Sequence, residues 1–276
     1  MILLLLLALV GDDDVLQQLR DKGVKVTATS AEVGDCSKWT DDDFKLLAKV
    51  TKLKSLSFGA GLGDAHLPLL VGLSELESLQ TNLAQITDDG VGGLAAFKNL
   101  KILKFFHPSK SFTGSGLSKL AGMEKLERLT VAGSLAFDDA GMAAVGKLTR
   151  LKEFRTWHAG QTLEGVKHLK GLTNLKNLTL GQRLAYKPPT TIADDTLAVL
   201  AELKSLETLE LQEARLKRET LVQLKALPGL KTLTLGGIDI AEAEVEQLRK
   251  DLAGVDVKWS KPNDVYQKRI DALFGK

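Results

Sequence analysis

Apolar residues recur along most of this chain with two alternating periods. The first is a short L-x-x-L-x-[LF] signature, whose apolar residues at alternate positions predict a strand with one buried face. The second places apolar residues about three apart, as at Val91, Leu94 and Phe97, which is typical of one face of a helix. The two patterns follow one another, so the sequence predicts strand, turn, helix and turn in regular succession.

The strand signature occurs eight times, and its first leucines are 23, 24, 26, 25, 24, 31 and 24 residues apart. Self-similarity at such a period indicates a repeat architecture in which each unit packs only on its neighbours and the apolar residues form one continuous layer. The copies are Leu53/Leu56/Phe58, Leu76/Leu79/Thr81, Leu100/Leu103/Phe105, Leu126/Leu129/Val131, Leu151/Phe154/Thr156, Leu175/Leu178/Leu180, Leu206/Leu209/Leu211 and Leu230/Leu233/Leu235.

These repeats, with the Thr-Asp-x-Gly type of opening seen at Thr87, resemble those of leucine-rich repeat proteins of the ribonuclease-inhibitor-like superfamily, with bacterial-type repeats. The resemblance covers roughly residues 24–259. It implies an α/β fold, a leucine-rich repeat solenoid or horseshoe with a concave parallel β-sheet and convex helices. It implies nothing specific about activity, because this family binds many unrelated partners.

The ends of the chain depart from the repeat pattern. Residues 1–11 are interpreted as a signal peptide, because the run MILLLLLALV is shorter than the ~20 apolar residues that span a bilayer but suits a secretory signal. The alternative is an apolar strap on the first repeat. Export to the periplasm or medium would follow from a signal peptide, and a cytoplasmic location is the alternative.

The rest of the chain is expected to divide into an N-terminal cap, a repeat array and a C-terminal cap, at residues 12–39, 40–252 and 253–276. In the N-terminal cap a helix should precede a single strand that contains Val24, Val26 and Ala28. In the C-terminal cap a strand near Val255 to Trp259 should precede a last helix.

Composition and candidate chemistry exclude several classes of function. Lys and Arg number 37 against 35 Asp and Glu, a net charge of +2, which is too balanced for nucleic-acid binding. The single cysteine, Cys36, excludes an internal disulfide and a cysteine-based zinc cluster. His107 and His158 follow strands two repeats apart and are interpreted as surface loop residues. Helix capping explains the repeated aspartates better than a calcium ladder does. We therefore expect no metal, no cofactor and no catalytic residue.

The central repeats carry the candidate binding residues. Phe106 and Trp157 flank the small Ala132 on the exposed face, which predicts a slot ~10 Å wide between two aromatic rings. Basic side chains beside it would suit a planar group with negative charge. The alternative is that both rings fold onto the rim and only shield the sheet. The full predicted set is Lys104, Phe106, Arg128, Ala132, Arg155 and Trp157, with Arg183 and Tyr186 from an insertion at 182–192.

The sequence thus favours a non-enzymatic binding scaffold that presents its concave surface to a protein or peptide partner. A structural or regulatory component of the cell envelope is the alternative. An enzyme subunit is the least favoured class, because the repeats leave no chain for a catalytic domain. Neither nucleic acid nor a transmembrane segment is expected.

Overall fold

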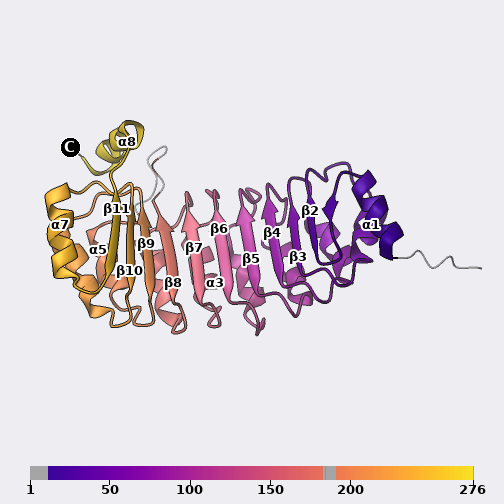
Figure 1. The fold of residues 1–276 in the computed structure, drawn as a ribbon, viewed down its shortest axis with the longest axis horizontal. Coiled ribbons are helices and arrows are strands. Elements are labelled where there is room, and N and C mark those ends of the chain that lie inside the picture. Colours follow the sequence, from indigo (N-terminus) through magenta and orange to yellow (C-terminus); the bar gives the residue numbers. More distant parts are fainter. Residues whose placement is uncertain (1–11, 183, 185–190, 276) are drawn as a thin grey trace, which may run out of the picture.

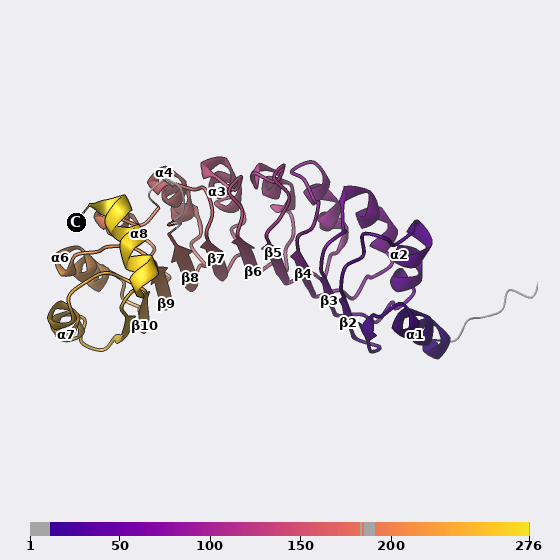
Figure 2. The same ribbon diagram turned by 90° about the horizontal axis from the view of Figure 1, so that it is seen from above.

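One curved sheet organises the computed structural model, which describes residues 12–182, 184 and 191–275. The sheet lines the inner side of an arc and the helices cover its outer side (Figures 1 and 2). Its 11 strands follow chain order, and every neighbouring pair is parallel except the antiparallel β1 and β2. The predicted leucine-rich repeat solenoid, with a concave sheet and convex helices, is confirmed.

The eight signature copies form eight consecutive strands. Their registers align one apolar residue per strand, so that Leu103 lies between Leu79 and Leu129, and all three are at most 1% exposed. These side chains form the continuous buried layer that the period predicts. The strands are β3 (Ser55–Phe58), β4 (Ser78–Asn82), β5 (Ile102–Phe106), β6 (Arg128–Ala132), β7 (Glu153–Trp157), β8 (Asn177–Gly181), β9 (Thr208–Gln212) and β10 (Thr232–Gly236).

The convex segments are short, and several are 3₁₀ rather than α-helical. Pro68 lacks the N–H that an α-helical turn needs, and Gly92 and Gly93 weaken the helix around them. The 3₁₀ segments are η1 (Asp64–Leu70), η2 (Gly90–Ala96), η3 (Ser115–Leu120), η4 (His168–Gly171) and η5 (Val222–Ala226). The α-helices are α2 (Asp41–Ala48), α3 (Asp139–Val145), α4 (Leu163–Lys167), α5 (Asp194–Leu200), α6 (Arg218–Leu221) and α7 (Glu242–Asp251).

The N-terminal end of the sheet differs from the expectation of one strand. After α1 (Asp12–Asp21), the chain forms β1 (Lys25–Val26), turns, and returns as β2 (Ser30–Val33). Thr27 and Ser30 stabilise the turn through a 2.8 Å hydrogen bond between their hydroxyls. As a result Ala31, rather than Ala28, lies beside Leu56 in the buried layer.

The C-terminal end carries β11 (Asp256–Ser260), close to its predicted position, and then α8 (Asp264–Phe274). The Arg249 guanidinium donates to the Val257 carbonyl at 3.2 Å, on the β11 strand that ends the sheet. The Asn263 side chain caps α8 by accepting from the Tyr266 amide at 2.9 Å. Figure 1 shows α8 beyond the carboxyl ends of the last strands, where Arg215 pairs with Asp271 at 2.6 Å.

Aspartates join the convex segments of adjacent repeats. Just before η3, the Thr113 hydroxyl accepts from the Ser115 amide at 3.3 Å. The same hydroxyl also donates to Asp88 of the preceding repeat at 2.6 Å. Asp64 and Asp139 accept in the same way from Thr87 and Thr162, at 2.6 and 2.7 Å. Each of these aspartates therefore fixes the start of the next repeat as well as carrying charge at its own.

Candidate functional site

The centre of the concave face brings six of the predicted residues together. In β5, Leu103 and Phe105 are buried while Lys104 and Phe106 are partly exposed, as strand alternation predicts. The registers of β5, β6 and β7 place Phe106 beside Ala132 and Ala132 beside Trp157. Lys104, Arg128 and Arg155 project from the same three strands. We call Phe106 and Trp157 the aromatic pair.

The predicted slot between the two rings of the aromatic pair is absent. The two ring centroids are 6.1 Å apart with an angle of 53° between the ring planes, and Ala132 beneath them is only 2% exposed. Because Ala132 has no side chain beyond its Cβ, both rings lean over it and bury apolar surface against each other. The expectation of a ~10 Å gap was therefore wrong. The pair forms a continuous aromatic ridge.

Arg155 is held in place by contacts with Trp157 on its own strand and with side chains of β8 and β9. Its guanidinium carbon lies 5.6 Å from the centroid of the Trp157 ring, within the range of a cation–π contact. Its Nε donates to the Thr179 hydroxyl at 3.3 Å, and its Nη2 lies 3.7 Å from a carboxylate oxygen of Glu210. Arg155 therefore positions the indole, and much of its charge is balanced by Glu210.

Lys104 and Arg128 supply the positive charge that remains near the aromatic pair. Arg128 is exposed, and its Nε lies 3.9 Å from Glu153, at the outer limit of an ion pair. Within the described part of the chain, no acidic side chain pairs with Lys104. An approaching negative group would find both cations accessible. Arg183 and Tyr186, the two predicted residues of the insertion, lie outside the described residues.

A second concave feature lies where the central strands end. His107, Gly133, His158 and Glu213 each directly follow a strand, and with Leu184 and the α8 residues Tyr266 and Arg269 they line an open groove of about 250 Å³. We call it the edge groove. His107 Nδ1 lies 3.1 Å from Asn82 Oδ1, and His158 Nε2 lies 3.2 Å from the Glu213 carboxylate. The histidines are on surface loops, as predicted, but they are brought into one groove.

Sequence reasoning missed the edge groove because its parts are far apart along the chain. His158 and Glu213 are 55 residues apart, and the α8 residues come from the last helix. The sequence did contain one indication of the groove. Four of its residues occupy the first position after a repeat strand, namely residues 107, 133, 158 and 213. The fold brings this place of each repeat to one edge.

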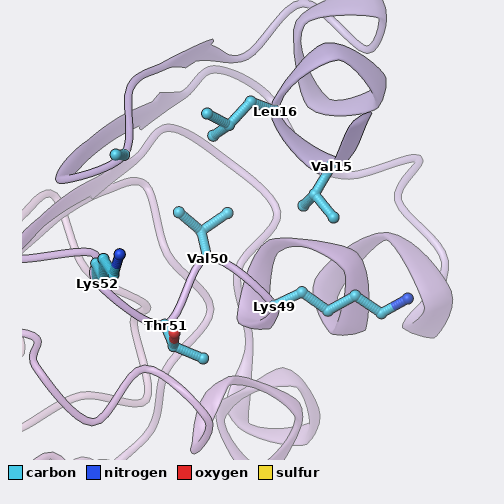
Figure 3. A pocket seen from close by; sticks show the side chains of 7 residues that line it. Val15, Leu16, Lys49, Val50, Thr51 and Lys52 are labelled. Atoms are coloured by element: carbon cyan, nitrogen blue, oxygen red, sulfur yellow. The ribbon is translucent and has the colours of Figure 1, made fainter. Parts of the chain in front are cut away.

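The gap near α1 and the Cys36 thiol offer no comparable site. Figure 3 shows a gap near α1, lined by Val15, Leu16 and Val50 among others, which has a volume of only about 30 Å³. Such a volume holds only about one or two water molecules. The Cys36 thiol donates to the Ala60 carbonyl at 3.2 Å, and burial raises its pKa to about 11, so it is protonated at neutral pH.

The described residues contain neither a cluster that could bind a metal ion nor a helix that could span a membrane. Across residues 12–182, 184 and 191–275, no group of three or more His, Cys, Asp or Glu side chains could hold a metal ion. In the same residues, every helix is too short or too polar to cross a bilayer.

Comparison with known proteins yields structural likeness alone. No protein-family model and no curated protein sequence matches this chain. Among solved structures, an internalin from Listeria monocytogenes is similar over 80% of this chain and 71% of its own, with 18% sequence identity and a TM-score of 0.41. Likeness at this identity concerns the fold and leaves the ligand open.

Proposed function

We propose that this protein is a non-enzymatic scaffold whose concave face binds a protein or peptide partner. The observation that carries the proposal is the aromatic ridge of Phe106 and Trp157 beside the accessible cations Lys104 and Arg128. Aromatic residues and arginine dominate the binding energy of protein interfaces. The strands on either side present small polar side chains, so the ridge is the strongest anchoring point on this face.

The partner surface that fits this arrangement is apolar at its centre and acidic at its border. A partner side chain laid across the tilted rings would bury apolar area without any rearrangement of the sheet. Lys104 and Arg128 would attract acidic groups and increase the association rate. Arg155 contributes chiefly by holding Trp157, because Glu210 already balances its charge.

The proposal is tested by capture from the native cell, identification of the captured protein by mass spectrometry, and calorimetric titration. Trp157→Ala and Lys104→Ala should each weaken binding of that partner by more than about 1 kcal/mol. Thr232→Ala, on the same face but outside the ridge, is the matched control and should change binding by less than about 0.5 kcal/mol. Equal affinities for all four proteins would move the site away from the concave centre.

We further propose export of the protein, supported by the apolar composition of residues 2–10, which lie outside the described residues. An exported scaffold of this type would serve as a structural or regulatory part of the cell envelope. The alternation of one strand with one short helical segment supports assignment to the ribonuclease-inhibitor-like group. Cell fractionation with N-terminal sequencing of the native protein tests export, and recovery of the intact N-terminus from the cytoplasm would contradict it.

A further inference from the structure

The edge groove continues directly from the aromatic ridge. His107 follows Phe106 in the chain and His158 follows Trp157, so the two surfaces share their backbone at the ends of β5 and β7. A partner segment that crosses the ridge along the strand direction reaches the groove within one residue. The groove is therefore part of the same binding surface.

The backbone at the edge groove is fixed in an unusual conformation. His107, His158 and Glu213 have φ angles of 45°, 51° and 62°, a left-handed region that favours glycine. The backbone amides of His107 and Glu213 donate to carbonyls at the ends of the next strands, at 2.9 Å in both cases. Because the strand ladder holds these residues, their side chains stand at defined places along the edge.

Gly133 provides the space in which the His107 ring lies. A Cβ at residue 133 would come within 2.5 Å of His107 Cδ2, and Gly133 itself has a φ of 72°. The imidazole of His107, from the adjacent repeat, thus occupies the space that a side chain at position 133 would need. Any larger residue at position 133 would therefore displace the His107 ring.

The described residues that line the edge groove include one carboxylate and one guanidinium. The carboxylate belongs to Glu213 and lies 3.2 Å from His158 Nε2. The guanidinium belongs to Arg269, and its carbon lies 5.7 Å from the Tyr266 ring centroid. No acidic side chain among the described residues pairs with Arg269. A guanidinium presents paired N–H donors that match the two oxygens of a carboxylate.

We propose that the edge groove binds a carboxylate carried by the partner segment that lies on the aromatic ridge, with Arg269 as its anchor. The inference rests on the proposed function and adds the chemistry that the partner must carry next to its aromatic or apolar anchor. The carboxylate comes either from an acidic side chain or from a chain terminus. Tyr266 contacts the guanidinium through a cation–π interaction and so helps to hold it in place.

Three small probes separate these sources when added to the whole protein. N-acetylphenylalanine carries a terminal carboxylate, the amide of N-acetyl-glutamyl-phenylalanine carries only a side-chain carboxylate, and N-acetylphenylalaninamide carries none. NMR signals of the His107 and His158 rings and of the Arg269 side chain report binding. At least one carboxylate probe should shift these signals, and the uncharged amide should not.

Substitutions identify the anchor. Arg269→Gln should weaken binding of the responding probe about tenfold, the loss expected for a charge-assisted hydrogen bond. Arg269→Lys keeps the charge but not the paired donors and should give an intermediate loss. Arg150→Gln, an exposed arginine that precedes β7 at the opposite edge of the sheet, is the matched control and should have no effect.

Each contrary result overturns the inference. Equal shifts with the uncharged amide, no shift with any probe, or undiminished binding to Arg269→Gln would all show that the groove does not select a carboxylate. Because the probes are used without the partner, such a failure leaves the calorimetric test of the ridge intact. Conversely, probe binding with no effect of Trp157→Ala on the partner would refute the proposed function alone.

Discussion

Thr113 donates both its hydroxyl and its backbone amide to the carboxylate of Asp88, at 2.6 and 2.9 Å, across the boundary between two repeats. The amides of Gly114 and Gly116 add further hydrogen bonds to the same carboxylate at 2.9 and 3.1 Å. One side chain therefore satisfies most of the donors that begin the next convex segment. A single ionised group couples the two repeats.

Asp88→Asn should destabilise the protein by about 1–2 kcal/mol, because an amide oxygen is a weaker acceptor than a carboxylate and the site is only partly shielded from water. Urea unfolding followed by circular dichroism measures the change. The neighbouring Asp89→Asn is the control, since Asp89 is exposed and its ion pair with Lys119 has a length of 3.5 Å. Equal losses for the two variants would contradict the role of Asp88.

The same site should make stability depend on acid. Burial alone would raise the pKa of Asp88, but hydrogen bonds from Thr113, Gly116 and Gly114 outweigh it and lower the pKa below its usual value of 3.8. The unfolded chain therefore takes up the proton first as pH falls. The stabilisation is complete above about pH 4 and is lost as the pH falls through the lower pKa of the folded state.

Accordingly, the difference in free energy of unfolding between the parent protein and Asp88→Asn should shrink between pH 5 and pH 3. Urea titrations of both proteins at the two pH values test this prediction. A difference that stays constant, or grows toward low pH, would show that Asp88 does not carry the effect.

Leu103→Ala should cost about 2–5 kcal/mol, because a close-packed layer between two repeats cannot collapse around the missing atoms. Leu103 is fully buried in the middle of β5. Leu16→Ala should cost less, since Leu16 is 8% exposed and borders the small gap shown in Figure 3. Chemical denaturation of both variants decides the matter, and similar losses would refute the argument from stacking.

Gly181→Ala should disturb Trp157 directly. A Cβ at residue 181 would lie 2.4 Å from the Trp157 Cβ, so the two strands would have to shift, at a cost of about 1–3 kcal/mol. Tryptophan emission should change together with stability. Gly122→Ala, where an added Cβ meets nothing within 4 Å, should leave both properties unchanged. An unaltered emission spectrum in Gly181→Ala would place the indole elsewhere.

The strands and their faces were predictable because they depend on period alone. The leucines of the signature determine which positions of β3 to β10 are buried, and this assignment holds for Leu103 and its neighbours. The strand β2 escaped notice because its buried residues, Ala31 and Val33, are small and few. It could have been found by stepping back one repeat from Leu56, which its register aligns with Ala31.

The shape of the candidate site was less predictable because it depends on side-chain angles and on distant segments. The sequence placed Phe106 and Trp157 in one row but could not show that they close over Ala132. Nor could it show that Glu210 would balance Arg155 from two strands away. The edge groove needed the position of α8, which no period along the array specifies.

The two ends of the sheet also limit how this surface can grow. At one end β1 has two residues and runs antiparallel, and at the other the Val257 carbonyl is occupied by Arg249. A further copy of the chain could not extend far along the two-residue β1, and Arg249 blocks one carbonyl of the other edge strand. The length of the concave face therefore depends on the number of repeats. Inserting or removing one whole repeat would lengthen or shorten this face by one strand spacing, about 4.8 Å. Such a change in the gene would alter the size of partner that the face accepts.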